Sequence, residues 1–246
     1  MDGVARPAPA RTTRRRASHS MEAVLSEAVA LLDDAGESAL TFRALAGRLG
    51  TGVGSIYWYV TGKDDLLDRA ADHVMGEVLR ATAADVGGDD PIAELRAIAV
   101  TLFDAVERRP WLAAKFMANT EVQPNTMRVY ERLGRPLLRL DLTARQRFHA
   151  VSAVVGFVIG TAADLGQEPP PEVADGTVGR DEYIAWFAAD WRRLDPTEFP
   201  FVHAILDEFA GHDDTEQFRA GLDLILDGIR GQVAAGRKER SSKRKG

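Results

Sequence analysis

Apolar residues recur every three or four positions along most of this chain, the spacing that places them on one face of an α-helix. The first such run follows Ser20 and ends at Gly36, and its shared face consists of Val24, Leu25, Ala28, Leu31 and Leu32. A half-buried β-strand would show alternating apolar and polar residues, and no such alternation extends for more than a few positions in this chain. The pattern therefore predicts an all-α fold.

Further helices are predicted along the rest of the chain. Their ranges are 42–49, 53–59, 63–79, 91–109, 110–119, 125–140, 144–165, 181–193, 200–210 and 214–233. Asp90 is predicted to cap the helix that begins at Pro91, where the missing N–H costs nothing. Thr143 is predicted to cap the long apolar helix that ends at Leu165.

Both ends of the chain differ from the middle in composition. Residues 1–19 and 237–246 are rich in arginine or lysine and nearly free of large apolar side chains, so we expect a disordered basic arm and a disordered basic tail. The formal net charge of the whole chain is nonetheless −6. The body between the two ends is therefore acidic, and any affinity for DNA has to reside on a defined local surface.

Composition also limits the chemistry that the chain can perform. Cysteine is absent, which removes disulfides, thiolate metal sites and a cysteine nucleophile. The five histidines are scattered along the chain, and we predict no metal site and no cofactor. We see no apolar run of membrane-spanning length and no secretory signal, so we expect a soluble, cytoplasmic protein without a membrane partner.

One stretch, residues 41–63, has the spacing of a helix-turn-helix. It reads TFRALAGRLGTGVGSIYWYVTGK, in which a helix of about two turns is followed by glycines and a very short helix. Gly50 suits the left-handed conformation that the turn needs. The positions expected to face inward are Leu45, Ala46, Leu49, Ile56 and either Trp58 or Val60. This motif predicts a DNA-binding domain at 20–66.

The same stretch resembles the tetracycline-repressor family of transcription regulators. Residues 40–41, 43–46, 49–50, 55–60, 62–63 and 66–67 carry the resemblance, and 218–229 resembles the family's last, dimer-forming helix. The resemblance implies a helical ligand-binding and dimerisation domain, here 67–236. It also implies a homodimer that represses transcription at a palindromic operator in double-stranded DNA and is released by a small-molecule effector, without enzymatic activity.

The residues of the motif suggest how DNA is contacted. Thr41, Tyr57, Tyr59 and Lys63 suit contacts to phosphates. A turn segment is expected to meet the bases, and it consists of Thr51, Gly52, Val53, Gly54 and Ser55. Because this segment is small and nearly apolar, close backbone approach and contacts to thymine methyl groups are expected there.

Three other side chains near the motif have competing interpretations. Arg43 is the side chain expected to read guanine. Arg48 is expected to be a solvated charge and not a DNA contact, and Trp58 is expected to lie in the core. Core packing also competes with DNA contact as the role of Tyr57.

Large side chains are concentrated in the C-terminal domain. The resemblance implies a central, mostly apolar pocket, and the residues predicted to line it are Phe103, Trp111, Phe116, Met117, Asn119, Phe148, His149 and Trp186. Plain core packing is the competing explanation for each ring. Val78 and Leu79 stand where family members that bind tetracycline have a histidine, so a metal-dependent effector is not expected.

Two apolar helices are predicted to form the homodimer. Their predicted interface residues are Val151, Val155, Val158 and Ile159 in one helix and Leu222, Ile225, Leu226 and Ile229 in the other. Packed against their symmetry mates, the two helices would form a four-helix bundle. The alternative is that both are buried within one subunit.

Two functions of other classes stay open from the sequence alone. One is a helical enzyme, against which stand the absence of cysteine and of GxSxG and P-loop motifs. The other is a nucleoid-type protein that binds DNA through its basic ends without sequence preference.

Overall fold

The computed structural model describes residues 19–118, 123–167, 170–174 and 176–243, and every regular element in these ranges is a helix. The prediction of an all-α fold is therefore confirmed. The chain divides into two compact units, Met1–Ala70 and Ala71–Gly246. The division falls inside α4 (Lys63–Ala81), a continuous helix that begins in the first unit and ends in the second.

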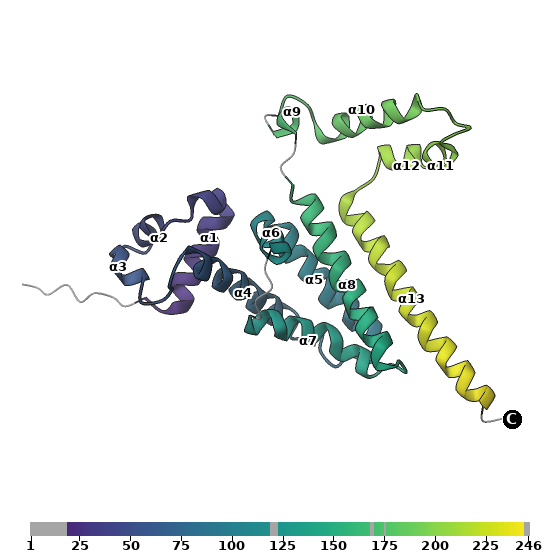
Figure 1. The fold of residues 1–246 in the computed structure, drawn as a ribbon, viewed down its shortest axis with the longest axis horizontal. Helices are drawn as coiled ribbons and strands as arrows, with labels where there is room; N and C mark the ends of the chain where they lie inside the picture. The colour runs from purple at the N-terminus through teal and green to yellow at the C-terminus, as the bar shows by residue number, and fades with distance from the viewer. Residues whose placement is uncertain (1–18, 119–122, 168–169, 175, 244–246) are drawn as a thin grey trace, which may run out of the picture. The chain divides into compact units, whose positions relative to one another are not determined.

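The first unit contains α1 (Met21–Ala39), α2 (Phe42–Arg48), α3 (Val53–Ile56) and the start of α4 (Figure 1). Ser20 caps α1, because its hydroxyl accepts a hydrogen bond from the Ala23 N–H at 3.1 Å. Gly36, the predicted end of this helix, has φ 71° and ψ 179°, so α1 is kinked there before it ends. The core of this unit includes Val24, Ala28, Leu32, Leu40, Leu45, Ile56, Val60 and Leu66.

A helical bundle forms most of the second unit. Its members after α4 are α5 (Pro91–Glu107), α6 (Pro110–Ala118), α7 (Pro124–Leu138), α8 (Ala144–Leu165) and α13 (Asp214–Lys243). The central helix is α5, which packs against α6, α7, α8 and α13. Asp90 caps it through hydrogen bonds from the Ile92 and Ala93 N–H groups at 2.8 and 3.3 Å. These two bonds lower the pKa of the Asp90 carboxyl below its usual value.

Aromatic stacking and one close approach hold α13 on the bundle. Phe103 of α5 and Phe218 of α13 stack with their ring centroids 3.6 Å apart. Gly221 of α13 lies under the ring of Phe157 of α8, and a Cβ added to Gly221 would come within 2.4 Å of that ring. An ion pair between Arg96 and Asp223, 2.6 Å long, adds a further link between α5 and α13. The hydrogen bond from Arg96 lowers the pKa of the Asp223 carboxyl.

Four short helices stand between α8 and α13: α9 (Pro171–Ala174), α10 (Arg180–Arg192), α11 (Pro200–Ala204) and α12 (Leu206–Ala210). Among them, α10, α11 and α12 pack with one another (Figure 1, green). Trp191 and Phe209 stack at a centroid distance of 4.1 Å and join α10 to α12.

The last helix is longer than predicted. We expected it to end near Val233 and to be followed by a disordered tail, but α13 continues to Lys243. The residues after Val233 are mostly alanine, arginine, lysine and glutamate, which favour helix, and basic side chains near a helix C-terminus interact well with its dipole. Residues 1–18 of the predicted N-terminal arm (1–19) and residues 244–246 lie outside the described ranges.

Candidate DNA-binding surface and ligand cavity

The turn between α2 and α3 is built from a cap and one special glycine. Thr41 caps α2, since its hydroxyl accepts a hydrogen bond from the Ala44 N–H at 3.1 Å. Gly50 adopts φ 63°, the left-handed conformation predicted for it, and the Thr51 N–H bonds back to the Ala46 carbonyl at 2.9 Å. Gly52 then forms the N-cap of α3 without a side-chain bond. The polypeptide therefore reverses within a few residues and presents α3 at the surface.

Only one side chain of α3 is buried, that of Ile56. Gly52, Val53 and Gly54 are exposed, and Thr51 and Ser55 are half-buried. Together with the buried Val60, Ile56 fastens the short helix to the unit. The turn segment 51–55 is thus accessible over most of its length, as contact with DNA bases requires.

Two large aromatic side chains follow α3 and point outward. Tyr57 is 62% exposed, and its ring meets Phe42 edge-on at a centroid distance of 4.8 Å. Trp58 is 89% exposed, so our prediction that it lies in the core is wrong. Val60, the alternative inward residue, occupies the core position instead, because it follows Ile56 by four residues and shares its side, whereas Trp58 follows Ile56 by two and points away. Trp58 is a candidate contact residue that the sequence reasoning missed.

The two arginines of α2 have different environments. Arg43 is exposed and forms no ion pair within the described residues. Arg48 donates to Asp34 at 2.5 Å and to Glu27 at 3.2 Å. The hydrogen bond to Asp34 is the main reason that the pKa of Arg48 is raised. Arg43 is therefore available to an external ligand, whereas Arg48 links α2 to α1.

Tyr59 and Lys63 have internal partners that the sequence did not predict. The half-buried Tyr59 donates its hydroxyl hydrogen to the carbonyl of His19. The Lys63 ammonium donates to the Glu37 carbonyl at 2.9 Å, at the end of α1. Both side chains hold the helix-turn-helix unit together, so the geometry gives Tyr57 and Arg43 stronger support as DNA contacts than Tyr59 and Lys63.

The second unit contains an apolar cavity of about 530 Å³. It lies among α4, α5, α6, α7 and α8, and its lining residues are Met75, Leu102, Phe116, Met117, Thr126, Val129, Tyr130, Leu133, Val155, Gly156, Ile159 and Gly160. Thr126 and Tyr130 supply the polar side-chain groups, and no charged side chain takes part. This volume and lining suit a small, uncharged and mostly apolar ligand.

The predicted pocket residues are only partly brought together. Phe116 and Met117 line this cavity, whereas Phe103, Trp111, Phe148, His149 and Trp186 do not. Phe103 is a core residue that stacks on Phe218. Phe148 and His149 are exposed on α8, and Trp186 is about half exposed on α10 beside Tyr183. Asn119 lies outside the described residues.

The predicted dimer residues mostly face the interior of their own unit. Val151, Val158, Leu222, Leu226 and Ile229 are buried, Val155 and Ile159 line the cavity, and Ile225 is half-buried. The five buried side chains are thus not available to a second copy in this packing, whereas the interface role of Val155, Ile159 and Ile225 stays a prediction. Each helix carries small or apolar residues on two faces, and helical spacing alone does not tell which face is turned inward.

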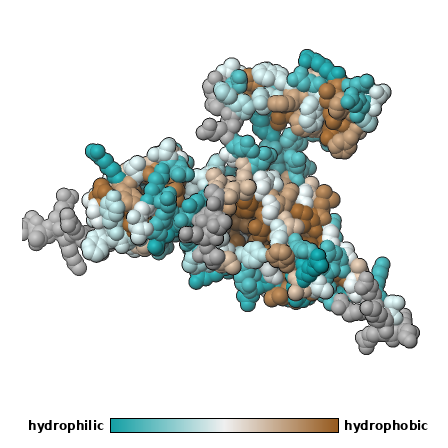
Figure 2. All heavy atoms as spheres, viewed as in Figure 1, coloured by the Kyte–Doolittle hydropathy of each residue, from teal (hydrophilic) through white to brown (hydrophobic). Residues whose placement is uncertain are grey.

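The outward faces of α8 and α13 are themselves rich in apolar and small residues, and Figure 2 shows apolar surface over α8. Phe148 and Leu224 are strongly exposed, and a hollow of about 630 Å³ between the two helices is lined in part by Phe157, Gly160 and Gly221. By length and composition alone, α8 could cross a membrane, although we expected no apolar run of that length. In the subunit, 28% of its most apolar 18-residue stretch is buried. This uncovered face is suited to another apolar surface.

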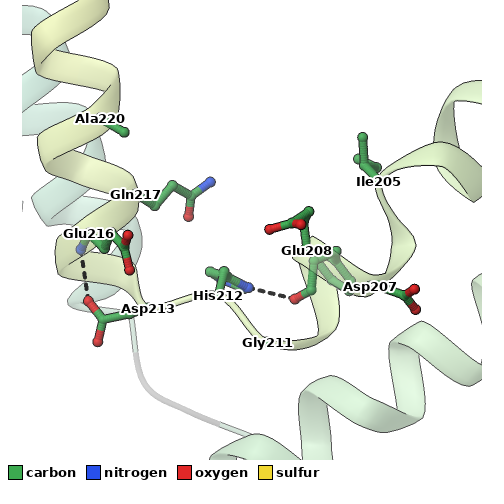
Figure 3. Close-up of a pocket in the computed structure, with 10 residues that line it drawn as sticks. Ile205, Asp207, Glu208, Gly211, His212, Asp213, Glu216, Gln217 and Ala220 are labelled. Atoms are coloured by element: carbon green, nitrogen blue, oxygen red, sulfur yellow. Dashed lines mark hydrogen bonds between the residues drawn. The ribbon is translucent and has the colours of Figure 1, made fainter.

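A second hollow, of about 520 Å³, lies between α12 and the start of α13 (Figure 3). Its lining includes the carboxylates of Glu208, Asp213 and Glu216, and the His212 ring lies between them. One nitrogen of that ring bonds to the Phe209 carbonyl at 2.7 Å. Among the described residues, no three histidine, aspartate or glutamate side chains are grouped as a metal site would need. The hollow is polar and acidic, so it is a poorer place for an apolar ligand than the cavity.

Comparison with known proteins assigns both units to one family. Residues 24–70 match the tetR family of bacterial regulatory proteins, and residues 85–233 match the tetracyclin repressor-like C-terminal domain. The chain is 28% identical to the transcriptional repressor DrrR1 of Streptomyces coeruleorubidus, over 89% of this chain and 80% of that protein. It is 25% identical to the class D tetracycline repressor of Escherichia coli, over 87% of this chain and 90% of that protein.

Solved structures agree with this assignment. A TetR transcriptional regulator of Streptomyces coelicolor is 38% identical, covers 87% of this chain and 99% of its own, and superimposes with a TM-score of 0.73. ActR of the same organism, solved with actinorhodin, is 21% identical over 88% of this chain and 98% of its own, with a TM-score of 0.71, and so supports the fold. The chain belongs to the tetracycline-repressor family and is a transcriptional regulator, not an enzyme.

Proposed function

We propose that this regulator represses transcription by binding a palindromic operator as a homodimer, and that a small, largely apolar effector releases it. The observation that carries the proposal is the exposure of Tyr57 and Trp58 directly after α3. Large rings turned to solvent on a soluble unit mark an interaction surface, because their apolar area gains most from being covered.

The DNA-contacting residues follow from their positions on the first unit. The turn segment 51–55 meets base edges by close backbone approach, and Arg43 reads a guanine from the first turn of α2. Thr41 and Tyr57 contact phosphates, and Trp58 covers an apolar part of the DNA surface. Tyr59 and Lys63 act mainly by holding the unit in shape, with their internal partners on His19 and α1.

The homodimer forms through the outward faces of α8 and α13. Phe148 and Leu224 supply large apolar contacts, and the small, exposed Gly228 lets a second copy approach closely. Four helices, two from each copy, then form the interface. A symmetric pair presents two copies of α3, which reach successive major grooves when they are about 34 Å apart.

The effector binds in the 530 Å³ cavity. A charged compound would lose its hydration there without gaining a charged partner, so the cavity selects an uncharged one. Because α4 contributes Met75 to the lining and continues from the DNA-binding unit, a ligand that displaces α4 changes the DNA-binding geometry. About 1.4 kcal/mol of differential binding suffices for a tenfold loss of operator affinity.

Genomic footprinting with the purified protein tests the operator. We expect a discrete palindromic site close to the regulated genes. The protein would act there in the cytoplasm, where the chromosome lies. A uniform footprint that disappears when residues 1–19 and 237–246 are deleted would instead support the nucleoid-type alternative. Deleting these ends should otherwise weaken binding and reduce its salt dependence while the choice of site is kept.

The substitution Tyr57→Ala tests the DNA face. It should abolish the gel shift of the footprinted operator while light scattering still detects the dimer. Phe201→Ala is the matched control, because Phe201 is another strongly exposed aromatic residue, on α11 of the second unit. Unchanged operator binding by the Tyr57 variant would reject the proposed face.

A further inference from the structure

A side chain of α4 completes the first turn of α7. One carboxylate oxygen of Asp72 accepts hydrogen bonds from the N–H groups of Asn125 and Thr126, at 2.8 and 2.9 Å. The Thr126 hydroxyl lies 3.3 Å from the same oxygen, and the Asn125 side chain donates to the Asp72 carbonyl at 3.1 Å. The two helices are thus joined at one point by four hydrogen bonds.

This junction replaces the local cap that α7 lacks. The helix begins at Pro124, which has no N–H, and the side chain of its N-cap residue Gln123 makes no capping bond. The N–H groups of Asn125 and Thr126 have no acceptor within the helix, and Asp72 satisfies both. A carboxylate at a helix N-terminus is also favoured by the helix dipole. The start of α7 therefore depends on where α4 lies.

The same junction borders the ligand cavity. Thr126 both contacts Asp72 and lines the cavity, and Val129, Tyr130 and Leu133 continue the lining along α7. On α4, Met75 follows Asp72 by three residues, so the two share a face, and Met75 lines the cavity. Close packing at Gly76 adds to the contact, because a Cβ there would come within 3.2 Å of the Asn125 side chain.

We propose that Asp72 is the positioning residue that transmits occupancy of the cavity from α7 to α4. A ligand that pushes on Thr126 and Tyr130 moves the first turn of α7, and the Asp72 junction makes α4 move with it. Without the junction, the ligand displaces α7 alone and the DNA-binding unit keeps its operator-binding geometry. This inference rests on the proposed effector role of the cavity.

The absence of cysteine in the chain allows a test with a tethered occupant. Met117→Cys places a single thiol on the exposed side of the cavity, and benzyl methanethiosulfonate attaches a benzyl group there through a disulfide. The measured quantity is the ratio of operator affinities before and after this modification, by fluorescence anisotropy. With Asp72 intact, the modification should weaken binding about tenfold.

Asp72→Ala in the same background should reduce that ratio to below about twofold. Asp72→Asn keeps an oxygen acceptor for both N–H groups and should retain most of the response. Glu77→Ala is the matched control, because Glu77 is another α4 carboxylate with a partner in the second unit, Arg109 at 3.3 Å. Neither Glu77 nor Arg109 lines the cavity. The response of this variant should be unchanged.

Circular dichroism and thermal unfolding establish that each variant is folded. If the Asp72→Ala chain is not folded, Thr126→Val replaces it: this change removes the hydroxyl bond to Asp72, keeps both N–H bonds, and should lower the ratio by less than Asp72→Ala would. An undiminished response in the Asp72→Ala chain, or an equal loss with Glu77→Ala, would overturn the assignment to Asp72. If the benzyl group leaves operator binding unchanged with Asp72 intact, the effector role of the cavity itself is wrong, and the Asp72 assignment falls with it.

Discussion

The two units expose apolar side chains for different reasons. In the first unit, exposure follows from the size of α3, which has four residues and buries only Ile56. In the second unit, exposure runs along α8 and α13, two long helices that bury one face and leave another uncovered.

This difference shows how far the binding partner of each exposed surface can be inferred from the geometry of that surface. A short helix on a small unit offers one accessible side, so the exposed rings that follow α3 lie on the DNA-binding face that we propose. A long helix in a bundle offers several sides, and only the packing shows which of them remain for a second copy. Substitutions on both kinds of surface can separate the two cases.

The largest effect is expected from a charge on the uncovered face of α13. Leu224→Glu, at a side chain that is 75% exposed, should leave the subunit folded but separate the dimer, because the interface would bury an unpaired carboxylate. Operator affinity should fall roughly a hundredfold or more. Sedimentation velocity and anisotropy measure the two losses.

Phe201→Glu is the control for this variant, since Phe201 is also exposed but lies on α11, which packs with α10 and α12. It should remain dimeric and bind operator normally. A dimeric Leu224→Glu protein would show that the subunits associate through another face.

A smaller effect is expected from the two arginines of α2. Arg43→Ala should cost about 1–3 kcal/mol of operator binding and relax the preference for guanine at one position. Arg48→Ala should change operator affinity less than about twofold, because its guanidinium is held by Asp34 and Glu27. Competition gel shifts with single-base operator variants measure both. The reverse order of effects would contradict the proposed orientation of α2.

The smallest effect concerns stability. Gly221→Ala should destabilise the protein by about 1–2 kcal/mol, because the new methyl group must displace the Phe157 ring. Gly134→Ala, within α7 and with open space around its Cβ position, should instead stabilise it by roughly 0.5–1 kcal/mol. Urea unfolding at a fixed protein concentration compares them. Equal effects at the two glycines would mean that α8 and α13 are not in close contact at Gly221.

The sequence predicted the elements better than their orientations. Capping residues and glycines act locally, so Ser20, Thr41, Gly50, Asp90 and Thr143 marked turns and helix starts that the structure contains. The exposure of Trp58 is an orientation that was predicted wrongly, although a residue two positions after the buried Ile56 does not share its helical face.

The candidate sites were predictable only where they coincide with a local motif. The helix-turn-helix spacing of residues 41–63 predicted α2, the turn at Gly50 and a short α3, and the structure contains all three, although α3 ends at Ile56 and not at 59. The cavity is lined by side chains from five helices. Only the packing of those helices shows that Phe116 lines the cavity, whereas Phe103 stacks in the core. The internal roles of Tyr59 and Lys63 depend on contacts with His19 and Glu37, far away in the sequence.

The cap that Asp72 supplies to α7 also bears on how the chain folds. Asp72 and Asn125 are 53 residues apart, so the first turn of α7 gains its acceptor only after a long loop has closed. A helix start without its acceptor frays, because nucleating a turn is unfavourable by itself. Ordering at the beginning of α7 is therefore a late event that reports the arrival of α4, and a fragment that starts beyond Asp72 would leave α7 frayed at the edge of its cavity.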